Sequence, residues 1–296
     1  MRQIFTSISK TDLKIELKQK EKYDIILSCR IFFPSKTNEV IFMLLCTDVG
    51  NTNIKFALYK GEKLLMKLRF STNRSKTADD YAVDLYTIFK INNVNVKEIS
   101  GSIISSVVPL VTDLLKKAIM TVANVDSLVI GPGIKTGLDI RLDNPGAVGS
   151  DIVCMCVALK EYYPCPVIVV GMGTATTILY MNENKAYCGG VILPGVQISL
   201  DALTARCALL PSVNFSAPQK AIGTNTADCI RSGIIYSNAA MIDGMIDRFE
   251  EEVQQKCTLV ATGGMAQHIV SYCKKNIIIN DDLVLEGLRL IYEKNL

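Results

Sequence analysis

Residues 43–60, MLLCTDVGNTNIKFALYK, set the pattern on which the rest of the chain is built. The apolar run 43–46 leads into the polar segment TDVGNTN, after which Ile54, Phe56 and Leu58 alternate with other residues. A short apolar run predicts a buried strand, and alternation with a period of two predicts a half-buried one. The stretch therefore predicts a strand, a polar turn and a second strand.

The polar turn has the parts that hold a phosphate. Gly50 permits close backbone approach, the amides of residues 51–53 can point at anionic oxygens, and Thr52 adds a hydroxyl donor. Asp48 would repel a phosphate directly but could bind one through Mg2+, which proteins hold with one or two carboxylates plus phosphate oxygens. A hairpin whose Asx side chains cap their own backbone explains a single turn of this kind equally well.

A second turn of the same kind begins at Gly171. The apolar run 167–170 enters GMGTATT at residues 171–177, and another strand pattern follows. Two phosphate-shaped turns in matching contexts suggest a duplicated domain that grips a nucleotide between its halves.

Composition narrows the class of protein. The 296 residues are 49% hydrophobic, which allows a sizeable core and favours two domains. The net charge of +3 comes from residues 1–41, so the remainder is neutral and nucleic-acid binding through a basic face has no support. No apolar run reaches about 18 residues, and we expect no membrane span.

Cysteine and histidine usage argues against several chemistries. The ten cysteines include no CxxC pair, which argues against a zinc site and favours reduced, buried thiols in a cytoplasmic protein. The single histidine, His268, has no partnered nucleophile motif, so Ser-His-Asp or Cys-His catalysis is not expected. No GxxxxGK[ST] sequence occurs, which excludes a P-loop kinase on motif grounds.

We expect three parts along the chain. Residues 1–42 are highly charged, lack a secretory signal pattern and predict a flexible or mis-assigned extension. Residues 43–148 and 149–296 would form two related α/β domains.

Two further segments carry candidate chemistry. The loop 131–145 is rich in glycine and proline and is a candidate substrate wall, in which Lys135 and Arg141 could meet an anionic group. Ser150 is a good N-cap for a helix that runs to about residue 162, which places Asp151 in the first turn. That carboxylate either complements the helix dipole or acts as general base in phosphoryl transfer to an alcohol.

Five motifs, in order, resemble those of type III pantothenate kinases, members of the actin-like ATPase superfamily. They are DVGNTNIKFALY (48–59), NPGAVGSD (144–151), GMGTATT (171–177), GGVILPGVQISLDAL (189–203) and IGTNT (222–226). The resemblance covers about residues 43–293. It implies two duplicated actin-like, ribonuclease H-like domains with ATP in the cleft between them. It also implies ATP-dependent phosphorylation of pantothenate to 4'-phosphopantothenate, the first step of coenzyme A biosynthesis.

The resemblance assigns roles to individual residues. Asp151 matches the catalytic base of the family, and the turn 262–264 matches the place where actin-like proteins seat adenosine. The residues implied to bind ATP are Asp48, Val49, Gly50, Asn51, Thr52, Asn53, Ile54, Lys55 and Thr174, with Asp48 also anchoring Mg2+. Those implied to bind pantothenate are Gly149, Ser150, Asp151, Ile152 and Thr226. Family members are homodimers, which implies a two-fold dimer through the helix near Asp151 or the helical region 224–252.

Three positions depart from the family pattern. Gly171 stands where the family usually has an aspartate associated with a monovalent cation, K+ or NH4+, while Ile152 replaces an arginine and Leu142 an aromatic residue. Loss of a preorganised charge contact beside a transferring phosphate costs roughly 3–4 kcal/mol, or about a hundred- to a thousandfold in rate, unless another residue compensates. A weakly active or non-catalytic paralogue that binds nucleotide or pantothenate in a regulatory role is therefore the alternative. A kinase for another small alcohol is a third possibility.

Overall fold

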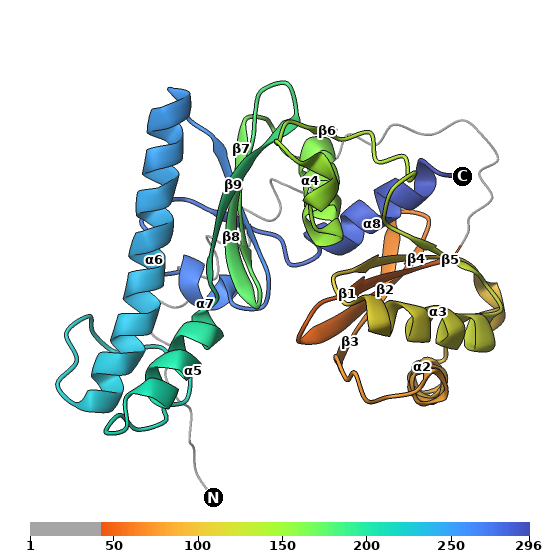
Figure 1. The fold of residues 1–296 in the computed structure, drawn as a ribbon, viewed down its shortest axis with the longest axis horizontal. Coiled ribbons are helices and arrows are strands. Elements are labelled where there is room, and N and C mark those ends of the chain that lie inside the picture. Colours follow the sequence, from red (N-terminus) through yellow and green to blue (C-terminus); the bar gives the residue numbers. More distant parts are fainter. Residues whose placement is uncertain (1–42) are drawn as a thin grey trace, which may run out of the picture. The chain divides into compact units, whose positions relative to one another are not determined.

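A computed structural model describes residues 43–296 (Figure 1). The expected extension, residues 1–42, lies outside the described residues. The described part contains two sheets, each with helices packed on its faces.

The first sheet has five strands in the order β3-β2-β1-β4-β5. Its strands are β1 (Met43–Val49), β2 (Asn53–Lys60), β3 (Lys63–Ser71), β4 (Ile99–Ser106) and β5 (Ser127–Val129). β1, β2 and β3 form an antiparallel meander, whereas β4 runs parallel to β1 and β5 parallel to β4. Helices α2 (Ala78–Ile91) and α3 (Pro109–Ala123) bury one face of this sheet.

The second sheet repeats this arrangement in the order β11-β10-β7-β8-β9, with β6 added beyond β9. Its strands are β6 (Asp139–Ile140), β7 (Val167–Met172), β8 (Ala175–Met181), β9 (Ala186–Pro194), β10 (Thr258–Thr262) and β11 (Ile278–Ile279). β7, β8 and β9 are antiparallel, and β10 and β11 continue parallel to β7. The same strand order and directions in both sheets confirm the predicted duplicated α/β fold. Strand β6 was not predicted, because it lies in the turn-rich loop 131–145.

Helices cover both faces of the second sheet (Figure 1). One face carries α6 (Thr226–Val253), α5 (Val196–Arg206) and α7 (Ala266–Val270), and the other carries α4 (Ser150–Tyr162). α4 also packs with α8 (Leu283–Glu293) against the first sheet. Two single-turn 3-10 helices complete the described part, η1 (Val96–Glu98) and η2 (Pro145–Ala147).

Helices α4 and α8 pack so closely at Gly287 that no side chain fits between their backbones. A Cβ atom placed on Gly287 of α8 would lie 1.9 Å from the carbonyl oxygen of Cys154 in α4. The backbones of the two helices therefore touch. Residues of α4 pack against both sheets, so this contact lies between the first sheet and the second.

Two predictions about local structure were wrong. Ser150 is not the N-cap of α4: the cap is Gly149, without a side-chain capping bond. The Ser150 hydroxyl instead accepts a hydrogen bond from the backbone amide of Ser106 at 2.9 Å and donates to the Ser106 carbonyl oxygen at 3.0 Å. The cysteines are also not uniformly buried, since Cys207 and Cys229 are exposed.

Within residues 43–296, no helix is long and apolar enough to cross a membrane.

The α4–α8 contact predicts opposite effects for two Gly→Ala substitutions in helices. Gly287→Ala forces overlap with the backbone of α4 and should lower the free energy of unfolding by about 2 kcal/mol or more. Gly244→Ala in α6 meets no atom within 4 Å and should raise it by about 0.5–1 kcal/mol, because alanine favours helix over glycine. Urea unfolding of both variants measures the difference, and equal effects would contradict the close contact.

Candidate active site

The two glycine-threonine turns lie against each other. In each turn the glycine amide bonds across the hairpin, Gly50 N to Asn53 O at 3.0 Å and Gly173 N to Ala175 O at 3.0 Å. The hydroxyls of Thr52 and Thr174 are 3.0 Å apart and share a hydrogen bond. The structure thus brings together two segments that lie 122 positions apart in the chain.

Two further glycines pack directly on the second turn. A Cβ on Gly195, the N-cap of α5, would lie 2.1 Å from the carbonyl oxygen of Thr174. A Cβ on Gly263, which has a φ of +102°, would lie 2.4 Å from the carbonyl oxygen of Met172. The positive N-terminal end of α5 and the turn after β10 therefore both adjoin the second phosphate-shaped turn.

The first turn is held from behind by the segment that follows β3. Thr72 Oγ1 donates to the carbonyl oxygen of Gly50 at 2.7 Å, and Arg74 donates to Asn51 Oδ1 at 3.3 Å.

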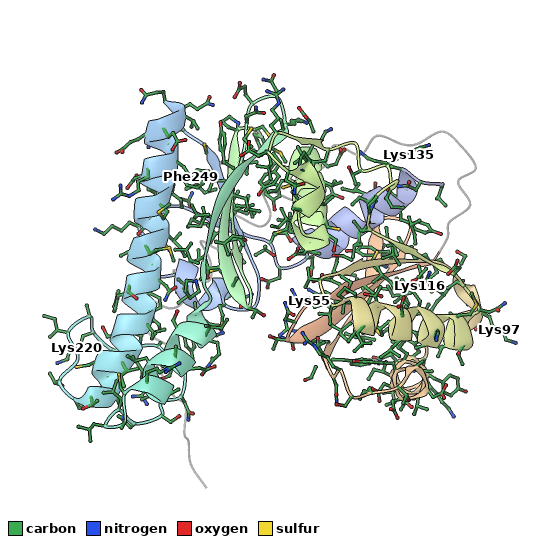
Figure 2. The ribbon with its side chains drawn as sticks, viewed as in Figure 1. Lys55, Lys97, Lys116, Lys135, Lys220 and Phe249 are labelled. Carbon is green, nitrogen blue, oxygen red and sulfur yellow. The ribbon has the colours of Figure 1, made fainter. Side chains whose placement is uncertain are left out.

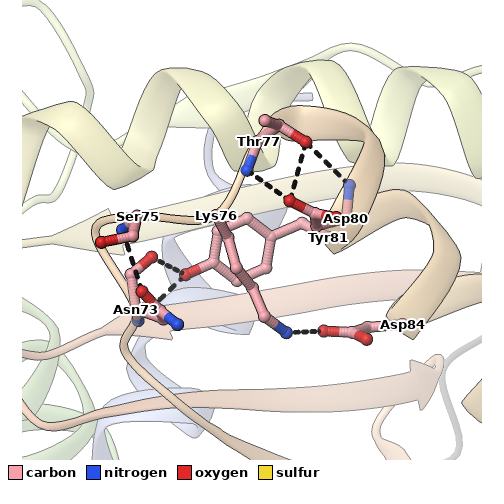
Figure 3. A network of polar contacts seen from close by, with 7 residues as sticks. All are labelled: Asn73, Ser75, Lys76, Thr77, Asp80, Tyr81 and Asp84. Atoms are coloured by element: carbon pink, nitrogen blue, oxygen red, sulfur yellow. Dashed lines mark hydrogen bonds and ion pairs between the residues drawn. The ribbon is translucent and has the colours of Figure 1, made fainter.

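This segment is anchored by a polar network at the start of α2 (Figure 3). Tyr81 donates to the carbonyl oxygen of Asn73 at 2.8 Å, and Lys76 pairs with Asp84. Thr77 and Asp80 form a reciprocal cap, in which the Thr77 amide donates to the Asp80 carboxylate at 2.8 Å. These interactions anchor the segment after β3, and that segment in turn fixes the shape of the first turn.

Two carboxylates converge beside these turns. Asp48 lies opposite Ser105 in the β1–β4 register, and Ser105 Oγ is 3.0 Å from Ser150 Oγ, next to Asp151. Burial raises the pKa of Asp48 to about 6; the Lys55 charge opposes this rise, and the nearby Asp151 carboxylate adds to it. The Asp151 carboxylate folds back over Gly149, because a Cβ there would lie 2.5 Å from Asp151 Oδ1. A carboxylate in this position could hold a divalent cation together with ligand oxygens, and Asp48 is the candidate.

Lys55, labelled in Figure 2, is one of the residues that line a cavity of about 300 Å3. The cavity is lined on one side by strands β2 and β3 and on the other by the turn after β10 and the start of α8. Its lining residues are Lys55, Phe56, Lys67, Leu68, Arg69, Gly263, Gly264, Gln267, Asp281, Asp282 and Leu285. Sequence reasoning missed Lys67 and Arg69, which alternate with apolar residues on β3 as an ordinary solvent-facing set does.

Some implied site residues can act only through their backbone, and others lie apart. Val49 and Ile54 are fully buried in the core of the first sheet, so their side chains cannot face a nucleotide. Ile152 packs against the hydrophobic cluster between α4 and the second sheet. Thr226 is the exposed first residue of α6, on the face of the second sheet opposite α4 and Asp151 (Figure 1).

The two basic residues of the loop 131–145 contact other parts of the structure. Lys135 is exposed, and its backbone amide and carbonyl are both bonded by Asn295, beyond the end of α8 (Figure 2). Arg141 pairs with Asp139 at 3.0 Å. The first part of the loop is thus fastened to α8 and the edge of the second sheet.

Gly171 lies buried in β7, where a Cβ would point at Thr177 Oγ1, 2.7 Å away, and at Met155 of α4. This is the α4 side of the second sheet, as Asp48 is on the α4 side of the first. Among residues 43–296, no cluster of three or more His, Cys, Asp or Glu side chains is arranged to hold a metal ion. A cation at this site would therefore depend on ligand oxygens as well as on Asp48.

The repeated sheets, with the same strand order and directions in each, define an actin-like α/β fold. Consistent with this class, a solved structure described as a 2-dehydro-3-deoxygalactonokinase from Sinorhizobium meliloti matches with a TM-score of 0.54 at 12% identity, over 85% of this chain and 96% of that one. That likeness concerns the fold alone.

Sequence comparison gives the family. The model for type III pantothenate kinase matches residues 44–248. A type III pantothenate kinase of an Exiguobacterium species (strain AT1b) is 43% identical over 86% of this chain and 99% of the relative, and that of Halalkalibacterium halodurans is 42% identical over 86% and 100%. The chain belongs to the type III pantothenate kinase family, which confirms the resemblance found in the sequence.

The raised pKa of Asp48 predicts that Asp48→Asn stabilises the fold near neutral pH. The folded protein binds the Asp48 proton more tightly than the unfolded chain, so the wild-type protein gains stability from this proton below about pH 4 and loses that gain as the pH rises through about 6. At pH 8 the wild type retains a buried charge, and the Asn variant should be more stable by about 1–3 kcal/mol. Urea unfolding at pH 4 and pH 8, with EDTA present, checks this: a difference that fails to shrink at pH 4 would contradict it.

Proposed function

We propose that the protein transfers the γ-phosphoryl group of ATP to the primary hydroxyl of pantothenate, giving 4'-phosphopantothenate for coenzyme A biosynthesis. The observation that carries this proposal is the convergence of both phosphate-shaped turns beside Asp48 and Asp151. Membership of the type III pantothenate kinase family supports the choice of acceptor.

Asp151 is the proposed general base. Its carboxylate has no hydrogen-bond or ion-pair partner among residues 43–296, whereas the carboxylate of Asp48 is bonded by Ser105 and faces Lys55. A free carboxylate at the start of α4 can orient the attacking hydroxyl and accept its proton. Asp48 is the proposed Mg2+ ligand.

The turns are proposed to hold the phosphates. The backbone amides around Gly50 and Gly173 and the hydroxyls of Thr52 and Thr174 supply neutral donors, and Lys55 supplies a positive charge beside them. Mg2+, when bound with ATP, neutralises charge that develops on the phosphate oxygens. The K+ or NH4+ dependence implied by the family stays a prediction, because position 171 offers no carboxylate; the atom nearest to a Cβ placed there is Thr177 Oγ1. A cytoplasmic location is part of the same proposal.

We further propose a homodimer whose substrate site uses both subunits. Thr226 and Asp151 lie on opposite faces of the second sheet within one chain. If both contact pantothenate, as the family resemblance implies, Thr226 must come from the second copy. An exposed helix N-terminus at Thr226 is accessible for such a contact.

The decisive test of the reaction is steady-state ADP release from ATP and Mg2+, with and without pantothenate, in potassium and then in sodium buffer. Asp151→Asn should lower kcat by about a hundred- to ten-thousandfold while leaving the KM for ATP nearly unchanged, because a base acts on the acceptor. Asp113→Asn, which removes an exposed carboxylate from α3, is the matched control and should behave as wild type.

The other outcomes are also informative. Saturable binding of ATP or pantothenate without turnover would overturn the kinase proposal and leave a nucleotide- or pantothenate-binding regulator, the reading that Gly171 favours. Faster turnover in potassium than in sodium buffer would show that a cation acts despite Gly171.

Subunit complementation tests the shared site. Asp151→Asn and Thr226→Arg should each be nearly inactive as separate homodimers. After the two proteins are unfolded together and refolded, mixed dimers contain one site with both native residues, so activity should return to about a quarter of wild type. A mixture that stays inactive, although mixed dimers form, would contradict the sharing of residues between subunits.

A further inference from the structure

A row of polar side chains crosses the first sheet at the level of Asp48. Strand register places Ser105 of β4 beside Asp48 of β1, Lys55 of β2 beside Asp48, and Arg69 of β3 beside Lys55. Neighbours directly opposite each other in antiparallel strands have Cβ atoms about 5 Å apart on the same face. Arg69 therefore ends a row that begins at the catalytic carboxylates.

The far end of this row opens into the cavity. Both Lys55 and Arg69 line it, and Gly263 and Gly264 form part of the opposite wall. Ile54, Leu68 and Phe70 belong to the hydrophobic cluster on the other face, so alternation along the strands directs Lys55 and Arg69 away from that core. Lys55 thus lines the cavity and also pairs across the strands with Asp48, at the start of the first phosphate-shaped turn.

The three cations of this wall differ in their partners. Lys67 is neutralised by Asp282, with contacts of 2.8 and 3.0 Å to the two carboxylate oxygens. Lys55 interacts with the charge of Asp48. Within residues 43–296, Arg69 forms no ion pair and no hydrogen bond through its side chain. One guanidinium therefore faces the cavity without a carboxylate.

We propose that Arg69 is a nucleotide-binding residue that contacts phosphate oxygens of ATP and ADP, extending the phosphate site beyond the two turns. This inference rests on the proposed function for the identity of the nucleotide. A planar guanidinium presents paired N–H donors that match phosphate oxygens, which a single ammonium does not. A ligand that reaches from the turn at Asp48 to the turn at Gly263 and is anionic at the first end has the form of a nucleoside polyphosphate.

The test compares Arg69→Gln with two other charge-removing variants of the full-length protein. Calorimetry with ATP, ADP and adenosine reports binding independently of turnover. Arg69→Gln should weaken ATP and ADP binding by about ten- to a hundredfold, as loss of a charged hydrogen bond does, and leave adenosine within about twofold. Lys63→Gln, at the start of β3 and outside the cavity lining, removes the same charge and should leave all three ligands unchanged.

The remaining comparison distinguishes a direct contact of Arg69 with phosphate from a general effect of positive charge in the cavity. Lys67→Gln removes a cavity cation that Asp282 already neutralises, and should weaken ATP binding less than Arg69→Gln. Equal losses in both variants, or a loss for adenosine as large as for ATP, would overturn the proposed contact. Binding is measured without pantothenate, so it does not depend on the reaction. A protein that binds ATP through Arg69 but shows no turnover would contradict the proposed reaction and still support the Arg69 contact.

Discussion

The close packing of α8 on α4 depends on one backbone contact, that of Gly287 with Cys154. Because no side chain separates the two helices there, α4 is fixed from one side by α8 and the first sheet and from the other by the second sheet. The start of α4 carries Asp151, and the residues before α8 include Asp282 of the cavity wall. The positions of chemical groups in both halves of the site therefore follow from a glycine that contributes no chemistry of its own.

Local pattern was sufficient to predict both turns and the strands beside them, because strand alternation and glycine-threonine turns depend on neighbours in the sequence; the family resemblance implied the two duplicated domains. The errors and omissions involve partners that are distant in the chain. Ser150 has the composition of an N-cap, yet its hydroxyl bonds to Ser106, from a strand more than forty residues earlier. Arg69 sits in an ordinary polar position of β3, and only the pairing of three strands places it beside Lys55 and the cavity. Strand β6 is two residues long and pairs with β9, which no local signal reveals.

The site concentrates groups whose burial is unfavourable. Asp48 is a carboxylate whose pKa is raised to about 6 by burial, and the hydroxyls of Thr47 and Thr176, fully buried beside the two turns, have no hydrogen-bond partner in the described part of the chain. A buried hydroxyl without a partner costs about 1–3 kcal/mol. The large apolar clusters on both sheets offset these costs, so the binding surface is stabilised by residues that never meet a ligand.

The hydrogen bond between Thr52 and Thr174 has a consequence for the proposed binding of a nucleotide. A phosphoryl group bonded by these hydroxyls from opposite sides needs them about 5 Å apart or more, roughly two hydrogen-bond lengths, whereas they are 3.0 Å apart. If both hydroxyls bind one phosphoryl group in this way, as the proposed function has it, the two turns must move apart, and the affinity is then the intrinsic affinity reduced by the fraction of molecules whose turns are separated. Under the proposed function each threonine has two opposing effects: its hydroxyl binds phosphate, and its hydrogen bond to the other threonine holds the two turns together. Removing either hydroxyl changes the population of open molecules and the strength of the phosphate contact together, so the measured loss of affinity understates the contact itself.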